Sequence, residues 1–110
     1  PDIFEFMQLS LEFCGYEVLV AKDGSEAVTK AISHVPDLII MDMFMPKMDG
    51  FQATSLIRAH PKTKHIPIVA ATAAVTEESL KRCLDAGCDE YLAKPFNLRE
   101  LLRIVERLLK

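Results

Sequence analysis

Three polar residues of different types end three apolar stretches of the sequence. Asp42 ends the stretch DLIIMD, Thr72 ends IPIVAAT, and Lys94 ends DEYLAK. A carboxylate, a hydroxyl and an ammonium group together suit the handling of a phosphoryl group, because the carboxylate can act as the nucleophile. The ammonium group can stabilise charge on the phosphoryl oxygens, and the hydroxyl can donate a hydrogen bond to one of them. A divalent cation normally completes such a site, since Mg²⁺ binds carboxylate and carbonyl oxygens.

Taken singly, each of these residues has a simpler explanation. An aspartate at a strand end is often a turn former, a threonine suits a strand because it is β-branched, and a lone lysine is most often solvated. The position of all three at the ends of predicted strands favours a common site.

The elements that would hold these residues alternate between helix and strand. Apolar residues at helical spacing predict helices, and short apolar runs bounded by charged or turn residues predict strands. The expected helices are 3–14, 27–35, 49–57, 76–86 and 97–109, and the expected strands are 16–21, 37–42, 66–72 and 89–94. Strands that alternate with helices indicate an α/β fold with a doubly wound parallel sheet. The functional site of such a sheet lies beyond the carboxyl ends of its strands, where the three polar residues would meet.

Several helix ends carry their own signals. Asp49 and Thr76 are predicted N-caps, because their side chains can accept hydrogen bonds from the first backbone N–H groups of a helix. Gly15 and Gly87 are expected to follow the last turns of two helices, where glycine is favoured.

The composition excludes several classes of protein. The 110 residues point to one domain covering 1–110, and 50% hydrophobic residues argue against disorder. The formal net charge of -3 argues against direct nucleic-acid binding, which needs a basic surface. No apolar run is long enough to span a bilayer, so no membrane association and a cytoplasmic location are expected.

The three cysteines predict no metal site and no disulfide framework. An odd number at irregular spacing favours reduced thiols. Cys83 and Cys88 have the wrong spacing for a zinc knuckle and no second pair accompanies them, so we expect both to be buried as small apolar residues.

A family resemblance sharpens the functional prediction. The chain resembles the bacterial response-regulator receiver domains of two-component signal transduction systems over residues 3–110. The resemblance rests on LIIMDMFMPKMDGF at 38–51, IPIVAATAAV at 66–75 and AGCDEYLAKPF at 86–96. It implies a phosphoacceptor and not an enzyme acting on a separate substrate. In this family, Asp42 would take a phosphoryl group from a histidine kinase or phosphotransfer protein, and Lys94 would contact that group.

The resemblance implies further roles at matching positions. Thr72 would hydrogen-bond the phosphoryl group and shift inward on activation, while Tyr91 would turn in or out with it as an aromatic switch. Phe44 would offer its backbone carbonyl to Mg²⁺ beside Asp42. Pro95 would follow a cis peptide bond, which is plausible because only X–Pro bonds adopt the cis form cheaply. The fourth helix, fifth strand and fifth helix of the family would form the switching surface, through which homodimers also assemble.

The sequence departs from the family at its start. The family's first strand, which ends in a magnesium-binding acidic pair, would precede Pro1, and Asp2 does not replace that pair. In the family order 2-1-3-4-5 this strand lies between the strands at 16–21 and 37–42, so each would present an unpaired edge.

Three explanations are open. Upstream residues can be missing, which a first residue other than Met favours; a second chain can pair with the exposed edges and form a dimer; or the four strands form an altered sheet without its metal site. The chain as given is expected to bind Mg²⁺ and accept phosphate weakly, whereas the parent protein would do both well.

Two other functions compete with the phosphoacceptor. One is a phosphorylation-independent, receiver-like interaction module, which the missing acidic pair favours and Asp42, Thr72 and Lys94 oppose. The other is a flavodoxin-like flavin carrier, which would need a phosphate-binding loop after the first strand.

Overall fold

A four-stranded parallel sheet forms the centre of the chain. The computed structural model describes residues 15–21, 23–43, 48–72, 76–93 and 98–109. The strands, in both chain and sheet order, are β1 (Val18–Ala21), β2 (Leu38–Asp42), β3 (Ile68–Thr72) and β4 (Glu90–Ala93). The helices are α2 (Gly24–His34), α3 (Gly50–Ala59), α4 (Glu77–Ala86) and α5 (Leu98–Leu109). The predicted helix at 3–14 falls outside the described residues.

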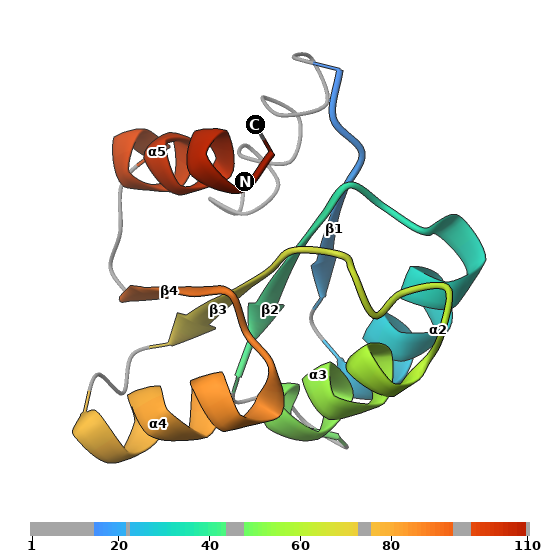
Figure 1. Ribbon diagram of the computed structural model, residues 1–110, viewed down its shortest axis with the longest axis horizontal. Helices are drawn as coiled ribbons and strands as arrows, with labels where there is room; N and C mark the ends of the chain where they lie inside the picture. The colour runs from blue at the N-terminus through green and yellow to red at the C-terminus, as the bar shows by residue number, and fades with distance from the viewer. Residues whose placement is uncertain (1–14, 22, 44–47, 73–75, 94–97, 110) are drawn as a thin grey trace.

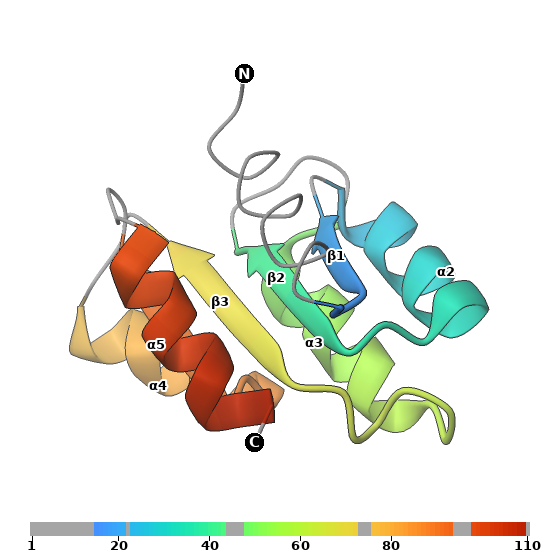
Figure 2. The same ribbon diagram turned by 90° about the horizontal axis from the view of Figure 1, so that it is seen from above.

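Helices cover both faces of the sheet. Figures 1 and 2 show α2, α3 and α4 on one face and α5 on the other. The apolar residues of β2 pack against the helices on both faces of the sheet, because successive strand residues point to opposite faces. Ile39 and Met41 belong to the core under α2, α3 and α4, while Leu38 and Ile40 belong to the core under α5. The predicted fold class, α/β with a doubly wound parallel sheet, is confirmed. None of the described helices is long and apolar enough to cross a membrane.

The helix caps agree with the sequence signals. The Asp49 side chain accepts the Gln52 N–H at 2.9 Å, and the Thr76 and Ser79 side chains cap each other's backbone at the start of α4. Gly87 ends α4 with a φ of 110°, a left-handed conformation that glycine adopts without a steric penalty. The caps at Asp49 and Thr76 begin α3 and α4 near the carboxyl ends of β2 and β3.

The sheet differs from the expectation of two bare edges. In the described part of the chain, β1 and β2 pair directly and in parallel, with Val18 opposite Leu38 and Ala21 opposite Met41. The Asp37 carboxylate extends this register, because it accepts the Glu17 N–H at 2.8 Å while the Asp37 N–H donates to the Glu17 carbonyl at 2.8 Å. The prediction that both strands would be unpaired where they face each other is therefore wrong. Direct pairing satisfies the backbone groups that a gap would leave buried and unpaired.

An arginine joins two connections at the amino ends of β3 and β4. The Arg58 guanidinium, on α3, donates to the carbonyls of Gly87 at 2.8 Å, Lys64 at 3.0 Å and Ile66 at 2.6 Å. It also donates to the Asp89 carboxylate at 2.6 Å. Arg58 therefore fixes the segments that lead into β3 and β4.

Val35 carries backbone strain at the end of α2. Its φ is 44°, in the left-handed region that a β-branched residue rarely adopts, and its side chain is 41% exposed. The Val35→Gly variant is expected to raise the free energy of unfolding by about 1 kcal/mol, because glycine removes the clash and little packing is lost. Urea unfolding followed by circular dichroism measures the change. Val35→Ala keeps a Cβ atom and should gain less; equal gains for both variants would contradict the strain argument.

Candidate functional site

Asp42 and Thr72 lie at the same edge of the sheet. Each is the last residue of its strand, and Asp42 pairs with Ala71, so Thr72 lies one register step beyond it. The Met43 N–H donates to the Ala71 carbonyl at 3.2 Å, which continues the strand pairing past Asp42. Asp42 is partly exposed, whereas Thr72 is buried with 1% of its surface accessible. The structure thus brings together the predicted nucleophile and the predicted hydroxyl donor.

The remaining predicted site residues are not all described. Phe44, Lys94 and Pro95 lie outside the described residues, so the magnesium-binding carbonyl, the phosphoryl-binding ammonium group and the cis peptide stay predictions. Ala93, which precedes Lys94 in the sequence, is the register partner of Thr72.

Two glycines allow close backbone contacts around the segment between β2 and α3. The Gly50 N–H donates to the Met43 carbonyl at 3.0 Å, and the Gly24 N–H donates to the Met48 carbonyl at 3.1 Å. A Cβ atom on Gly50 would lie 2.7 Å from both the Asp42 carbonyl oxygen and the Met43 Cα. Only glycine permits this close approach of two backbones. The sequence did not predict the contact of Gly24 with Met48.

Tyr91, the predicted aromatic switch residue, lies close to Thr72 on the neighbouring strand. Tyr91 and Ala93 share one face of β4, and Ala93 pairs with Thr72, so Tyr91 is one diagonal step from Thr72. The Tyr91 side chain is 42% exposed and lines a pocket of about 210 Å³ together with Leu80 and Leu84 of α4. The position fits an aromatic side chain turned outward; the switch itself stays a prediction.

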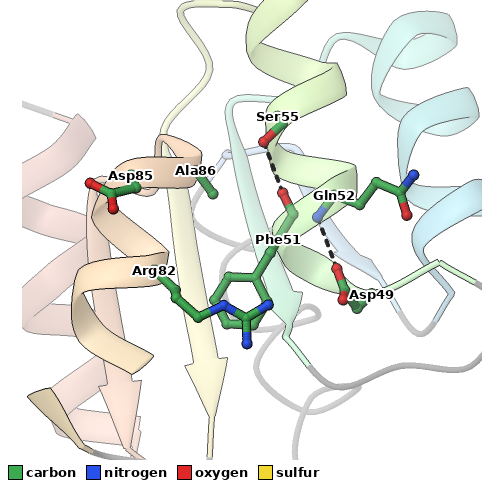
Figure 3. A pocket seen from close by; sticks show the side chains of 7 residues that line it. All are labelled: Asp49, Phe51, Gln52, Ser55, Arg82, Asp85 and Ala86. Atoms are coloured by element: carbon green, nitrogen blue, oxygen red, sulfur yellow. Dashed lines mark hydrogen bonds between the residues drawn. The ribbon is translucent and has the colours of Figure 1, made fainter. Parts of the chain in front are cut away.

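An open groove of about 440 Å³ lies between the side chains of α3 and α4. Figure 3 shows Arg82 of α4 reaching over the Phe51 ring of α3, with its guanidinium carbon 4.0 Å from the ring centroid. The Ser55 hydroxyl donates to the Phe51 carbonyl at 3.1 Å on the same helix. The cation–π contact ties α4 to the first turn of α3, close to the segment that follows Asp42. Sequence patterns did not reveal this contact, since nothing in the sequence pairs Arg82 with Phe51.

The described residues supply only part of a magnesium site. Asp42 is a suitable carboxylate ligand, but no group of three or more Asp, Glu, His or Cys side chains within the described ranges could hold a metal ion. These residues therefore do not by themselves fit a complete Mg²⁺ site.

The thiols predicted to be buried are buried. Cys83 and Cys88 are 2% and 7% exposed, respectively, and both are reduced. Burial raises the pKa of Cys83 and raises the pKa of Cys88 to about 12, so both thiols are protonated at neutral pH. Cys14 lies outside the described residues.

Two of the similar curated proteins are named as transcriptional regulators. Over 110 residues the chain is 36% identical to the "DNA-binding dual master transcriptional regulator RpaA" of Synechocystis sp., covering 100% of this chain and 46% of that protein. Over 109 residues it is 37% identical to the "Alkaline phosphatase synthesis transcriptional regulatory protein PhoP" of Bacillus subtilis, covering 99% of this chain and 45% of that protein. The chain spans less than half the length of both relatives.

Similar solved structures are receiver domains and chemotaxis regulators. The receiver domain of sensor histidine kinase PA1611 from Pseudomonas aeruginosa, with a magnesium ion in its active site cleft, has a TM-score of 0.84 and 41% identity. That match covers 97% of this chain and 85% of the other. The chemotaxis protein CheY4 of Vibrio cholerae has a TM-score of 0.86 and 36% identity, covering 97% of this chain and 89% of the other.

The family model described as "Response regulator receiver domain" matches residues 1–106. That match spans the edge where β2 and β3 end and both layers of helices. This chain belongs to the family of response regulator receiver domains.

Proposed function

We propose that this domain accepts a phosphoryl group on Asp42 from a histidine kinase or phosphotransfer protein of a two-component system. The observation that carries the proposal is the position of Asp42, partly exposed at the carboxyl end of β2 and one register step from Thr72. The buried strand holds the carboxylate at a fixed place, and its exposure leaves it accessible to a phosphorylated donor.

The proposed chemistry needs few groups of this chain. An Asp42 carboxylate oxygen attacks the phosphorus atom of a donor phosphohistidine. The bond from phosphorus to the donor's imidazole nitrogen breaks, and the electron pair stays on that nitrogen. Thr72 would donate a hydrogen bond to a phosphoryl oxygen, and Lys94 would offset its negative charge. The domain acts as an acceptor in this step and turns over no separate substrate.

Magnesium is the ion we propose for the parent protein. The PA1611 receiver domain was crystallised with Mg²⁺ in its active site cleft, which supports the same ion for this family member. Asp42 would be a ligand, together with acidic residues from outside the described ranges.

The proposed output surface is formed by α4, β4 and α5. Thr72 and Tyr91 lie on the face of the sheet that α4 covers, so a shift of Thr72 toward a phosphoryl group would free space for Tyr91 to turn inward. Such a change would alter the surface offered to a downstream partner or to a second copy of the chain.

Phosphorylation is tested by intact-mass spectrometry after incubation with acetyl phosphate and Mg²⁺. We expect a mass gain of one phosphoryl group in the chain and none in Asp42→Asn, which keeps the shape of the side chain but removes the nucleophile. Because the chain is expected to bind Mg²⁺ weakly, the phosphorylated fraction should grow when a longer parent protein is used. Phosphorylation of Asp42→Asn at the same level would show that another residue is the acceptor.

A phosphorylation-independent interaction module is the second candidate. The lack of a metal-binding cluster among the described residues favours it. No mass gain in a longer parent protein, combined with partner binding that is unchanged in Asp42→Asn, would support this second function.

A further inference from the structure

Two cysteine side chains meet at the end of α4. Cys83 lies in the last turn of the helix, and Cys88 follows the left-handed Gly87. The Cys88 N–H donates to the Cys83 carbonyl at 3.0 Å, and the Gly87 N–H donates to the same carbonyl at 3.2 Å. This turn folds the chain back so that residues five apart in sequence come into contact.

The spacing of the two cysteines suits a covalent bond. A 3.0 Å hydrogen bond between their backbones keeps the two Cα atoms within about 7 Å, and disulfides join Cα atoms about 4.4–6.8 Å apart. Both side chains also line the same cavity between α4 and β4, so the two thiols lie on the same side of the turn.

The buried thiols line a cavity that borders the protein surface. The cavity of about 210 Å³ lies between α4 and β4, and Leu80, Leu84 and Tyr91 also line it. Leu84 is 67% exposed, so the side of this cavity formed by α4 lies close to solvent. Thr54 of α3 contacts Cys88 from the core side, with 3.9 Å between its hydroxyl and the sulfur.

We propose that Cys83 and Cys88 are a dithiol that closes into an intramolecular disulfide when the protein meets a small-molecule disulfide. In the first step the deprotonated Cys83 sulfur attacks one sulfur of the reagent, whose S–S bond breaks and releases a thiol. The deprotonated Cys88 sulfur then attacks the Cys83 sulfur, and the second half of the reagent leaves as a thiol. Two cysteine thiols are oxidised and one reagent disulfide is reduced to two thiols, which take up the two protons.

The surroundings of the thiols predict how the reaction depends on pH. Burial holds both thiols protonated; Arg82 on α4 and Arg58 on α3 lower the thiol pKa values, and Asp89 before β4 raises that of Cys88. Since only thiolate attacks, the rate should rise about tenfold per pH unit around neutrality.

Closure would fix the turn that joins α4 to β4. The Gly87 carbonyl in this turn accepts from Arg58 at 2.8 Å, and Leu84 and Tyr91 lie at its surface. The disulfide would therefore restrict the movement of α4 at the proposed output surface formed by α4, β4 and α5. Its formation depends on the packing of the two thiols and not on the phosphoacceptor role of Asp42.

The experiment treats the folded protein with oxidised glutathione, blocks remaining thiols with N-ethylmaleimide and digests with trypsin. Every protein tested carries Cys14→Ala, so that Cys83 and Cys88 are the only cysteines that can react. No Lys or Arg lies between Cys83 and Cys88, and cleavage after Arg82 leaves both on one peptide. We expect that peptide to lose two hydrogen atoms and to carry no maleimide. Cys83→Ser and Cys88→Ser should each stop the closure, and either variant suffices if the other fails to fold.

Two outcomes would overturn the proposal. One is a peptide that keeps two maleimide groups in the folded protein while the urea-unfolded protein oxidises. The other is glutathione attached to one cysteine without closure. The Val35→Gly variant tests the route: an unchanged rate supports reaction in the folded state, and a rate that falls as stability rises would show that the thiols react only after unfolding.

Discussion

The Arg58→Met variant is expected to lower the free energy of unfolding by roughly 3–5 kcal/mol. Arg58 is 21% exposed in its side chain and holds three carbonyls and one carboxylate, as described above. Methionine fills similar space but donates no hydrogen bond. The carbonyl of Ile66, whose bond to Arg58 is 2.6 Å long, would lose a charged partner in a partly buried setting. Urea unfolding followed by circular dichroism measures the loss.

Arg82 is the control that distinguishes the loss of the Arg58 hydrogen bonds from the loss of one positive charge. Arg82→Met removes an exposed cation–π contact with Phe51 and should cost about 0.5–1 kcal/mol. Asp89→Asn keeps the side-chain shape but weakens the Arg58 contact and the hydrogen bond from the Ile68 N–H, which is 2.8 Å long. The stability lost in Asp89→Asn should lie between the losses for Arg58→Met and Arg82→Met. Equal losses for Arg58→Met and Arg82→Met would show that the carbonyl contacts contribute little.

The Gly50→Ala variant is expected to cost about 2–3 kcal/mol of stability and to impair phosphorylation of Asp42. The new Cβ atom would lie 2.7 Å from the Asp42 carbonyl oxygen and 2.8 Å from the Met43 sulfur. The methionine side chain can move, but the backbone of Asp42 can yield only by shifting the end of β2. The proposed nucleophile would then move relative to Thr72. Unfolding and the rate of phosphoryl gain from acetyl phosphate measure the two effects.

The control for Gly50→Ala is a change on the same helix that meets no backbone. Gln52→Ala alters an exposed side chain in the first turn of α3, whose backbone N–H still donates to Asp49. It should leave stability within about 0.5 kcal/mol and phosphorylation unchanged. If Gly50→Ala behaves like Gln52→Ala, the close approach of α3 to β2 does not position Asp42.

Local sequence signals predicted most of the architecture. The apolar runs at 38–42 and 68–72 are buried on both faces, as a central parallel strand requires, and the caps at Asp49 and Thr76 begin helices where expected. These features depend on residues close together in the chain. They also sufficed to place Asp42 and Thr72 at one edge.

Features that depend on distant partners were not predictable. The direct pairing of β1 with β2 depends on backbone hydrogen bonds that any residue types can form, so no side-chain pattern predicted it. The contacts of Arg58 join two connections that are separated in the sequence, and a lone arginine is usually expected to be solvated. The constraint on Gly24 comes from the backbone of Met48, which is distant in the sequence.

The order of the described strands has a consequence for how the sheet assembles. Each strand pairs with its successor in the chain, from β1 to β4, so every parallel pairing closes a single strand–helix–strand loop. The entropy lost on loop closure is then smaller than in a sheet whose sequential strands are separated by another strand. Folding can proceed by adding one unit at a time to a growing edge, and low contact order favours fast folding. Once β2 has paired with β1, its remaining edge is the template for β3, and the carboxyl end of β2, which carries Asp42, takes its place as that second unit closes.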